Sequence, residues 1–258
     1  MLTDFSPRTF SMAFRIMFCL CFIGGALFAR ANDDLLQWIT QMPAAYAGVK
    51  DYTAIFVRSE ILRGKQRPEE AMVLKFREPL QVYMKWTSES GKDREAIFFK
   101  GRDADKVLVH EPGWLSGHFT VLLPPDGPSI KDRSRHPFNE IGIARVIELI
   151  RATFEKAKQA GDLEVRDLGV TRVEGRAMRA IEGILPKDPA KKYYCYRAIV
   201  TIDEEFKLPV AVKVYDWEDK LVEHYRYTHL QINTGLTDLD FSTENPGYMF
   251  PTTRINRR

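Results

Sequence analysis

Alternation of apolar and polar residues with a period of two is the strongest constraint on the fold of this chain. It begins at residue 51, and in residues 72–77 and 80–87 every second side chain is large and apolar. Successive side chains of a strand point to opposite faces of a sheet, so this period predicts strands with one apolar face. The connections at Glu78-Pro79 and residues 88–92 are too short for a helical crossover, so neighbouring strands are predicted to be antiparallel.

A helical period of apolar residues appears twice. Residues 33–42 begin with acidic residues and carry an apolar stripe, which predicts a short helix that ends at Pro43. A second, clearer helix follows Asn139, a suitable N-cap, and ends at Gly161. Its stripe consists of Ile143, Val146, Ile147, Ile150, Phe154 and Ala157. One face of this helix must pack on an apolar surface.

The strand pattern returns after the second helix. It covers residues 163–170, 178–185, 193–202, 208–215 and 221–232. The order helix, strands, helix, strands predicts an α+β fold in which one strongly curved antiparallel β-sheet wraps over helices on its concave side. The chain has 258 residues, 45% of them hydrophobic, so residues 32–258 are enough for a single domain with a sizeable core.

The N-terminal residues have the pattern of a secretory signal. Arg8 and Arg15 precede an apolar run at 16–29, and Ala29-Arg30-Ala31 supplies the small residues that signal peptidase requires. We therefore predict that residues 1–31 are cleaved, leaving an exported protein with no stable membrane anchor. A retained anchor and a lipoprotein signal are the alternatives, but the run is shorter than the about 20 residues of a membrane span, and no small residue directly precedes Cys21.

Charge and motif content argue against several classes of function. The formal net charge of +3 at pH 7 falls close to zero without residues 1–31, and no dense basic stripe occurs, so no nucleic-acid partner is expected. No phosphate-binding glycine loop or Gly-x-Ser-x-Gly motif is present, and His110, His118 and His136 lack metal-ligand spacing. We predict neither catalytic residues nor a metal or cofactor, and therefore no enzyme. Cys195 alone follows the signal, so no internal disulfide forms.

Residues 113–137 interrupt the strand pattern with many Gly and Pro residues. They are predicted to form a flap or an irregular excursion, although residues 119–123 are apolar. Arg133, Arg135 and His136 precede the second helix, and helix N-termini favour anions, so these residues are candidates for contact with an anionic headgroup or a protein partner. The alternative is a loop with solvated charges.

Three segments carry a resemblance to a known family. REPLQVYMKW (77–86), FKGRDADKVLVHEP (99–112) and the closing run from residue 215 to residue 248 resemble landmarks of the periplasmic lipoprotein-carrier superfamily typified by LolA, most of all its bacterial members labelled only as domains of unknown function. The closing run has an acidic turn, an aromatic strand with Thr228, and then Asn233, Leu236, Leu239, Phe241, Pro246 and Gly247. The resemblance implies a periplasmic, unclosed half-barrel of about eleven antiparallel strands with an apolar cavity between sheet and helices.

The resemblance makes the apolar rows candidates for the wall of that cavity. In residues 221–232, Leu221, Glu223, Tyr225, Tyr227 and His229 share one face. The candidate wall residues are Trp38, Met72, Leu74, Phe76, Met84, Trp86, Phe98, Phe154, Tyr225 and Tyr227. The alternative is that these side chains simply fill a core.

These considerations lead to two hypotheses for function. The first is non-covalent binding of an acylated lipid or a lipoprotein, for carriage or sensing. Ten buried methylenes contribute roughly 8 kcal/mol, and association costs of about 4–15 kcal/mol would leave one chain weakly bound, which favours several chains. The second hypothesis is a sensor or interaction module with a self-filled core and an envelope protein as partner.

Overall fold

The computed structural model describes residues 34–113, 118–251 and 253–256. The signal peptide predicted at residues 1–31 lies outside these ranges. Helical residues 34–40 and α2 (Met42–Tyr46) open the described chain. Pro43 lies in the first turn of α2, where its missing N–H interrupts no helical hydrogen bond, so the chain remains helical beyond the residue predicted to end the helix.

The described residues form one sheet of thirteen strands. The strands are β1 (Asp51–Leu62), β2 (Lys65–Gln66), β3 (Glu70–Arg77), β4 (Gln81–Trp86), β5 (Glu95–Phe99), β6 (Val107–His110), β7 (Thr120–Leu123), β8 (Glu164–Val173), β9 (Arg176–Ile184), β10 (Arg197–Asp203), β11 (Pro209–Tyr215), β12 (Leu221–Ile232) and β13 (Arg254–Asn256). Their spatial order is β13-β7-β6-β5-β4-β3-β1-β12-β11-β10-β9-β8, with β2 paired to β1. Strands β1 and β3 to β7 form one meander, and strands β8 to β12 form a second. The two meanders meet where β1 pairs with β12.

The predicted α+β half-barrel is confirmed. Neighbouring strands are antiparallel except β13, which runs parallel to β7. The strand order ends at β8 and at β13, so the sheet is open among the described residues. Because β2 and β13 have only 2 and 3 residues, the longer strands number eleven, as predicted.

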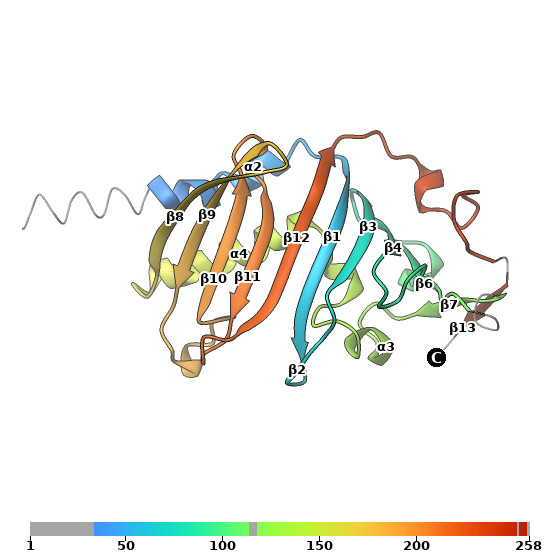
Figure 1. The fold of residues 1–258 in the computed structure, drawn as a ribbon, viewed down its shortest axis with the longest axis horizontal. Helices are drawn as coiled ribbons and strands as arrows, with labels where there is room; N and C mark the ends of the chain where they lie inside the picture. The colour runs from blue at the N-terminus through green and yellow to red at the C-terminus, as the bar shows by residue number, and fades with distance from the viewer. Residues whose placement is uncertain (1–33, 114–117, 252, 257–258) are drawn as a thin grey trace, which may run out of the picture.

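The helices lie on the concave side of the sheet. The long helix α4 (Ile143–Gln159) runs behind the strands from β9 to β12, and α2 lies near the upper ends of the same strands (Figure 1). The short elements are α3 (Pro128–Lys131), η1 (Asp103–Asp105), η3 (Phe138–Glu140), η4 (Pro189–Lys191) and η5 (Asp238–Phe241). The apolar stripe of α4 packs with the inner side chains of both halves of the sheet in one large core, except for Ala157, which packs with Leu185 and Tyr193.

The helix α4 begins later than predicted. Asn139 lies in η3, and the N-cap of α4 is Gly142, whose φ of 123° is rarely adopted by other residues. A Cβ at Gly142 would lie 2.6 Å from Cε2 of Phe76, and the Tyr52 hydroxyl accepts a hydrogen bond from the Ile143 N–H at 3.0 Å. The helix start is therefore set by close packing on the sheet rather than by a local cap. Gly161 follows the helix with a φ of 70°, as its predicted terminator role requires.

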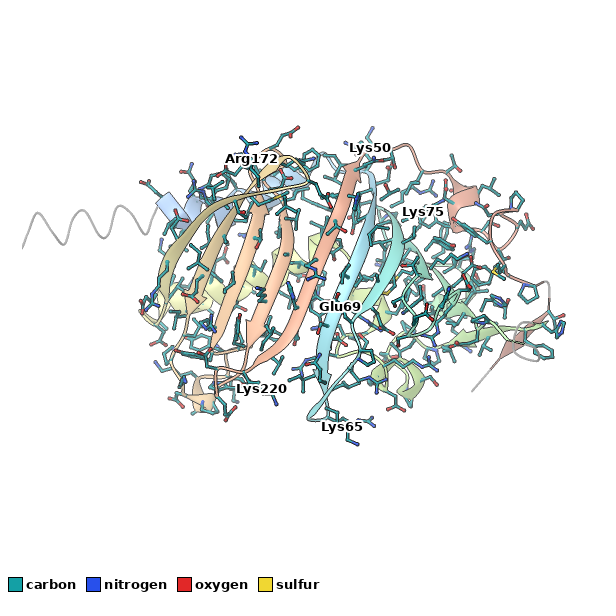
Figure 2. The ribbon with its side chains drawn as sticks, viewed as in Figure 1. Lys50, Lys65, Glu69, Lys75, Arg172 and Lys220 are labelled. Carbon is teal, nitrogen blue, oxygen red and sulfur yellow. The ribbon has the colours of Figure 1, made fainter. Side chains whose placement is uncertain are left out.

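The outer face of the sheet is not wholly solvated. The segment from residue 236 to residue 250 covers β4, β5 and β6, and Phe241 packs there with Tyr83, Ile97 and Leu108 in a second small core. Tyr248 stacks on Tyr83 with ring centroids 3.9 Å apart. Lys75, on the outer face of β3 (Figure 2), pairs with Asp240 at 2.7 Å. The closing run thus packs on the outer face of β3 to β6 and stabilises that half of the sheet.

The described part of the predicted excursion is folded onto the domain. Residues 120–123 form β7, which pairs with β6 and extends the sheet, so the apolar stretch is a strand and not part of an irregular loop. After β7 come α3 and η3, which lead into α4. The excursion therefore carries the chain from the edge of the sheet back across its concave side.

Candidate functional site

A cavity of about 310 Å³ lies between the inner face of the sheet and the segment from α3 to α4. Its wall includes side chains from β1, β4, β5, β6, β7, β11 and β12, together with one face of α4. The wall is mainly apolar because inner positions of the strands alternate with outer ones. Apolar wall residues include Phe56, Met84, Trp86, Val121, Leu149, Phe154, Val212 and Tyr227.

Two buried carboxylates form the polar end of the cavity. Glu60 and Glu223 are direct cross-strand partners in the β1–β12 pair, and they are 3% and 1% exposed. Like charges opposite each other destabilise a sheet unless other groups neutralise them. Both residues also line the cavity.

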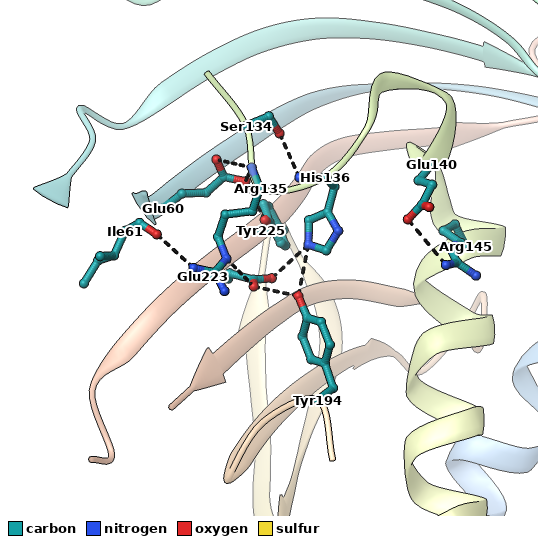
Figure 3. A network of polar contacts seen from close by, with 10 residues as sticks. All are labelled: Glu60, Ile61, Ser134, Arg135, His136, Glu140, Arg145, Tyr194, Glu223 and Tyr225. Atoms are coloured by element: carbon teal, nitrogen blue, oxygen red, sulfur yellow. Dashed lines mark hydrogen bonds and ion pairs between the residues drawn. The ribbon is translucent and has the colours of Figure 1, made fainter. Parts of the chain in front are cut away.

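The segment between α3 and η3 supplies the neutralising groups for Glu223 (Figure 3). Arg135 donates from Nε to Glu223 at 2.7 Å, and Nε2 of His136 lies 3.1 Å from the same carboxylate. The Tyr194 hydroxyl donates to Glu223 at 2.6 Å. Three groups therefore converge on one buried carboxylate.

Glu60 is held by the same segment and by β12. The Tyr225 hydroxyl donates to Glu60 at 2.6 Å, and the backbone N–H of Arg135 donates to it at 3.3 Å. Nη1 of Arg135 also donates to the carbonyl of Ile61 at 2.9 Å. Residues 135 and 136 thus tie the excursion to the inner face of the sheet at the β1–β12 junction.

The environment of this cluster sets its charge state. Burial disfavours the charged imidazole of His136, but the hydrogen bond and the charge of Glu223 outweigh burial and raise the pKa of His136. Burial also acts to raise the pKa of Glu223, but contacts with His136, Tyr194 and Arg135 outweigh it and lower that pKa. Burial, with the neighbouring carboxylates, raises the pKa of Tyr225 far above its usual value. Glu223 is therefore a charged carboxylate paired with Arg135 and His136, and the neutral phenols of Tyr194 and Tyr225 donate hydrogen bonds to Glu223 and Glu60.

Cys195 also lines the cavity beside this cluster. It is 3% exposed, and burial together with the nearby charge of Glu223 raises the pKa of its thiol to about 12. The protonated thiol is a poor nucleophile. Cys195 therefore contributes wall surface.

A second, polar pocket of about 540 Å³ adjoins the cavity. Arg58, Arg67, Arg94 and Arg133 line it together with Glu60, Glu70 and Asp132. The lining residues common to both spaces are Arg58, Glu60, Arg94, Ser129 and Arg133. The apolar cavity therefore has an arginine-rich neighbour at the end formed by β1, β5 and the excursion.

The predicted wall residues divide into two groups. Met84, Trp86, Phe154, Tyr225 and Tyr227 line the cavity. Met72, Leu74, Phe76 and Phe98 are instead in the packed core. Trp38 packs against that core, and the charged groups of Arg179 and Lys207 lie over its ring. Their part in ligand binding stays a prediction.

The predicted headgroup residues also divide. Arg133 lines both the cavity and the polar pocket. His136 also lines the cavity, but its imidazole and the guanidinium of Arg135 are engaged with Glu223. Sequence reasoning missed Phe56, Glu60, Glu223 and Tyr194 as cavity residues. Glu223 carried a usable signal, because it is a charged residue on the same row as Tyr225 and Tyr227. His229, which was predicted to share a face with Tyr225 and Tyr227, does not continue the buried face, because its side chain is 73% exposed.

No group of three or more His, Cys, Asp or Glu side chains in residues 34–113, 118–251 and 253–256 is arranged to hold a metal ion. None of the helices in those ranges has the length and apolar character needed to cross a membrane.

The fold and the site together define a class of protein: a curved antiparallel half-barrel with an apolar cavity on its concave side. The chain belongs to the family described as "Protein of unknown function (DUF1571)", whose model matches residues 49–250. The prediction that the chain belongs to a family labelled only as of unknown function is confirmed. No curated protein matches the chain.

Several solved structures are similar to this chain. The LolA superfamily protein NE2245 from Nitrosomonas europaea is 10% identical, with 81% of this chain and 96% of that chain covered and a TM-score of 0.37. The lipoprotein LppX of Mycobacterium tuberculosis is 12% identical, with 80% and 98% covered and a TM-score of 0.48. MucB in the Pseudomonas aeruginosa MucA/MucB complex is 16% identical, with 81% and 60% covered and a TM-score of 0.41.

Proposed function

We propose that this protein is exported to the periplasm and binds a lipid or a lipid-modified molecule non-covalently in its concave cavity, for carriage or sensing. The observation that carries the proposal is the cavity of about 310 Å³, with its mainly apolar wall and its polar neighbour. Sites for small molecules are concave and mostly apolar, with a few polar groups that fix orientation. An amphiphile matches that arrangement.

The size of the cavity favours a single acyl chain. Pockets that bury most of a drug-sized ligand measure about 300–1,000 Å³, and this cavity of about 310 Å³ is at the lower end. The sequence argument favoured several chains because one chain alone is weakly bound. With one chain, polar contacts must supply the remaining affinity.

We further propose that the protein acts by binding and not by catalysis. The two buried carboxylates that line the cavity are occupied, since Glu223 accepts from Arg135 and Tyr194, and Glu60 accepts from Tyr225. A general base needs a free position within hydrogen-bonding distance of a substrate proton. The occupied carboxylates support a structural role.

An interaction module is the second candidate. It is favoured by β8, an edge strand on which Leu168, Val170 and Val173 are 50%, 48% and 42% exposed. An exposed apolar edge can pair with an added strand. In that case the core residues Met72, Leu74, Phe76 and Phe98 serve stability alone.

A test of the first candidate fills the cavity. Thr153 on α4 lines the cavity, and the neighbouring Ala152 is exposed on the same helix. We expect Thr153→Trp to abolish binding of laurate, whereas Ala152→Trp, the matched control, leaves it unchanged. The measurement is native mass spectrometry of protein purified from periplasm without detergent, followed by addition of laurate and solvent extraction of bound molecules.

The outcomes separate the two candidates. A stoichiometric acylated adduct that Thr153→Trp removes and Ala152→Trp keeps supports the lipid-binding function. A clean apo mass that takes up neither laurate nor longer fatty acids and lipopeptides contradicts it and leaves the interaction module.

A further inference from the structure

The arginines of the polar pocket have more guanidinium donors than the surrounding acids occupy. Glu70 pairs with Arg58 at 2.6 Å, whereas Glu111 is shared by Arg94 at 2.8 Å and Arg133 at 3.4 Å. Arg67 has no ion-pair partner among the described residues. One carboxylate for two guanidinium groups, and none for a third, leaves donors available to an anion.

The remaining acids of the pocket are engaged elsewhere. Asp132 pairs with Arg63, which lies outside the polar pocket. Glu60 also lines the pocket, and its oxygens accept from the Tyr225 hydroxyl and from the Arg135 backbone N–H. Neither acid is paired with Arg67 or Arg133. Arg67 and Arg133 therefore keep N–H donors that Glu60 and Asp132 do not occupy.

An unpaired donor lies beside this charge. Trp86 lines the cavity and is only 6% exposed, and its Nε1 has no hydrogen-bond acceptor among the described residues. The guanidinium of Arg94 lies 5.2 Å from the Trp86 ring centroid, and Arg94 lines both spaces. Buried polar groups normally have a partner, so an orphaned N–H in a cavity wall indicates an acceptor that is supplied from outside the chain.

We propose that the ligand is a single-chain amphiphile with an anionic head, a carboxylate or a phosphate, bound by Arg67, Arg94 and Arg133. The inference rests on the proposed lipid-binding function and specifies its ligand class. The chain occupies the apolar cavity, and an oxygen of the head or of its ester accepts from Nε1 of Trp86. Arginine suits this role because its planar fork of N–H donors binds carboxylate and phosphate oxygens in pairs.

This assignment differs from the site expected from sequence. Arg135 and His136 were candidates for headgroup contact, but their side chains are committed to Glu223. Arg133 is half-exposed and lines the polar pocket, so it alone of that group remains a headgroup residue. Arg67 and Arg94 lie in the connections that precede β3 and β5, and only the folded sheet brings them together.

The test compares three probes with the same acyl chain. Laurate has a carboxylate head, lauroyl-lysophosphatidate has a phosphate head, and monolaurin is uncharged. We expect both anionic probes to bind at least about tenfold more tightly than monolaurin, and added salt to weaken only the anionic probes. Affinities are measured by isothermal titration calorimetry on detergent-free protein, below the micelle concentration of each probe.

Variants assign the preference to the pocket. Arg67→Gln combined with Arg133→Gln should weaken both anionic probes about tenfold and leave monolaurin within about twofold. Arg172→Gln is the matched control, because Arg172 lies in the β8–β9 hairpin far from β2 (Figure 2). Trp86→Phe keeps the aromatic ring and removes the donor. The indole N–H signal of Trp86 should shift on addition of laurate in proton–nitrogen spectra.

The outcomes distinguish this inference from the proposed function. Tighter binding of either anionic probe, lost in the double arginine variant, supports the inference, and the better probe identifies a carboxylate or a phosphate head. Equal binding of all three probes overturns the anionic head while the lipid-binding function stands. Binding of none of them overturns both.

Discussion

Removing Arg135 should destabilise the fold by about 2–3 kcal/mol. Loss of one partner from a buried ion pair costs about 3–5 kcal/mol, because it leaves the other charge buried and uncompensated. Two features place Arg135→Ala below that range: the Arg135 side chain is 36% exposed, and Glu223 keeps its contacts with His136 and Tyr194. For a domain of this size the expected fall in Tm is about 5–10 °C.

Urea unfolding followed by tryptophan fluorescence measures the effect, provided that the m-value is unchanged. Arg63→Ala is the matched control in the same region, because the Arg63–Asp132 pair is exposed, at 74% and 55%. Exposed pairs contribute little, so Arg63→Ala should cost less than about 0.5 kcal/mol.

A double-mutant cycle isolates the interaction with Glu223. In a Glu223→Gln background the buried negative charge is absent, so Arg135→Ala should cost at least about 1 kcal/mol less than in the wild type. The reasoning is refuted if Arg135→Ala costs no more than Arg63→Ala, or costs the same in both backgrounds.

Two further predictions concern pH and the outer core. The folded pKa of His136 is raised above 6.5, so its contribution to stability is complete below pH 6.5 and is lost as pH rises through the folded pKa. The urea midpoint of the wild type should therefore decrease as pH rises through the folded pKa, whereas that of His136→Gln should not change over the same range. Tyr248→Ala removes the stack on Tyr83 and should lower the free energy of unfolding by about 2 kcal/mol; calorimetry showing a loss under about 0.5 kcal/mol would mean that the closing run packs only loosely.

Strands were predictable because their sequence pattern directly encodes the two faces of a sheet. Residues 72–77 and 80–87 were assigned correctly for that reason, and they correspond to β3 and β4. The start of α4 was not predictable. Asn139 is a good local cap, but the tight approach of Gly142 to Phe76 joins segments far apart in the chain. Tertiary packing can override the local capping preference of a residue when it fixes the backbone conformation.

The cavity was predictable only as a face of the sheet. The alternation places Leu74 and Met84 on the same inner face as directly paired residues of β3 and β4. Only Met84 lines the cavity, whereas Leu74 is 0% exposed in the core. The difference depends on where α2, α4 and the excursion cover the sheet, and a period of two contains no information about that covering.

The carboxylates at the β1–β12 junction connect the excursion to the fold. Glu60 and Glu223 face each other across the two strands that join the meanders, and a sheet with these charges buried and unpaired would be strongly disfavoured. Arg135 contributes both a guanidinium for Glu223 and a backbone N–H for Glu60. The segment that closes one side of the cavity is therefore the same segment that makes the central strand pair possible, so the fold and the cavity form together.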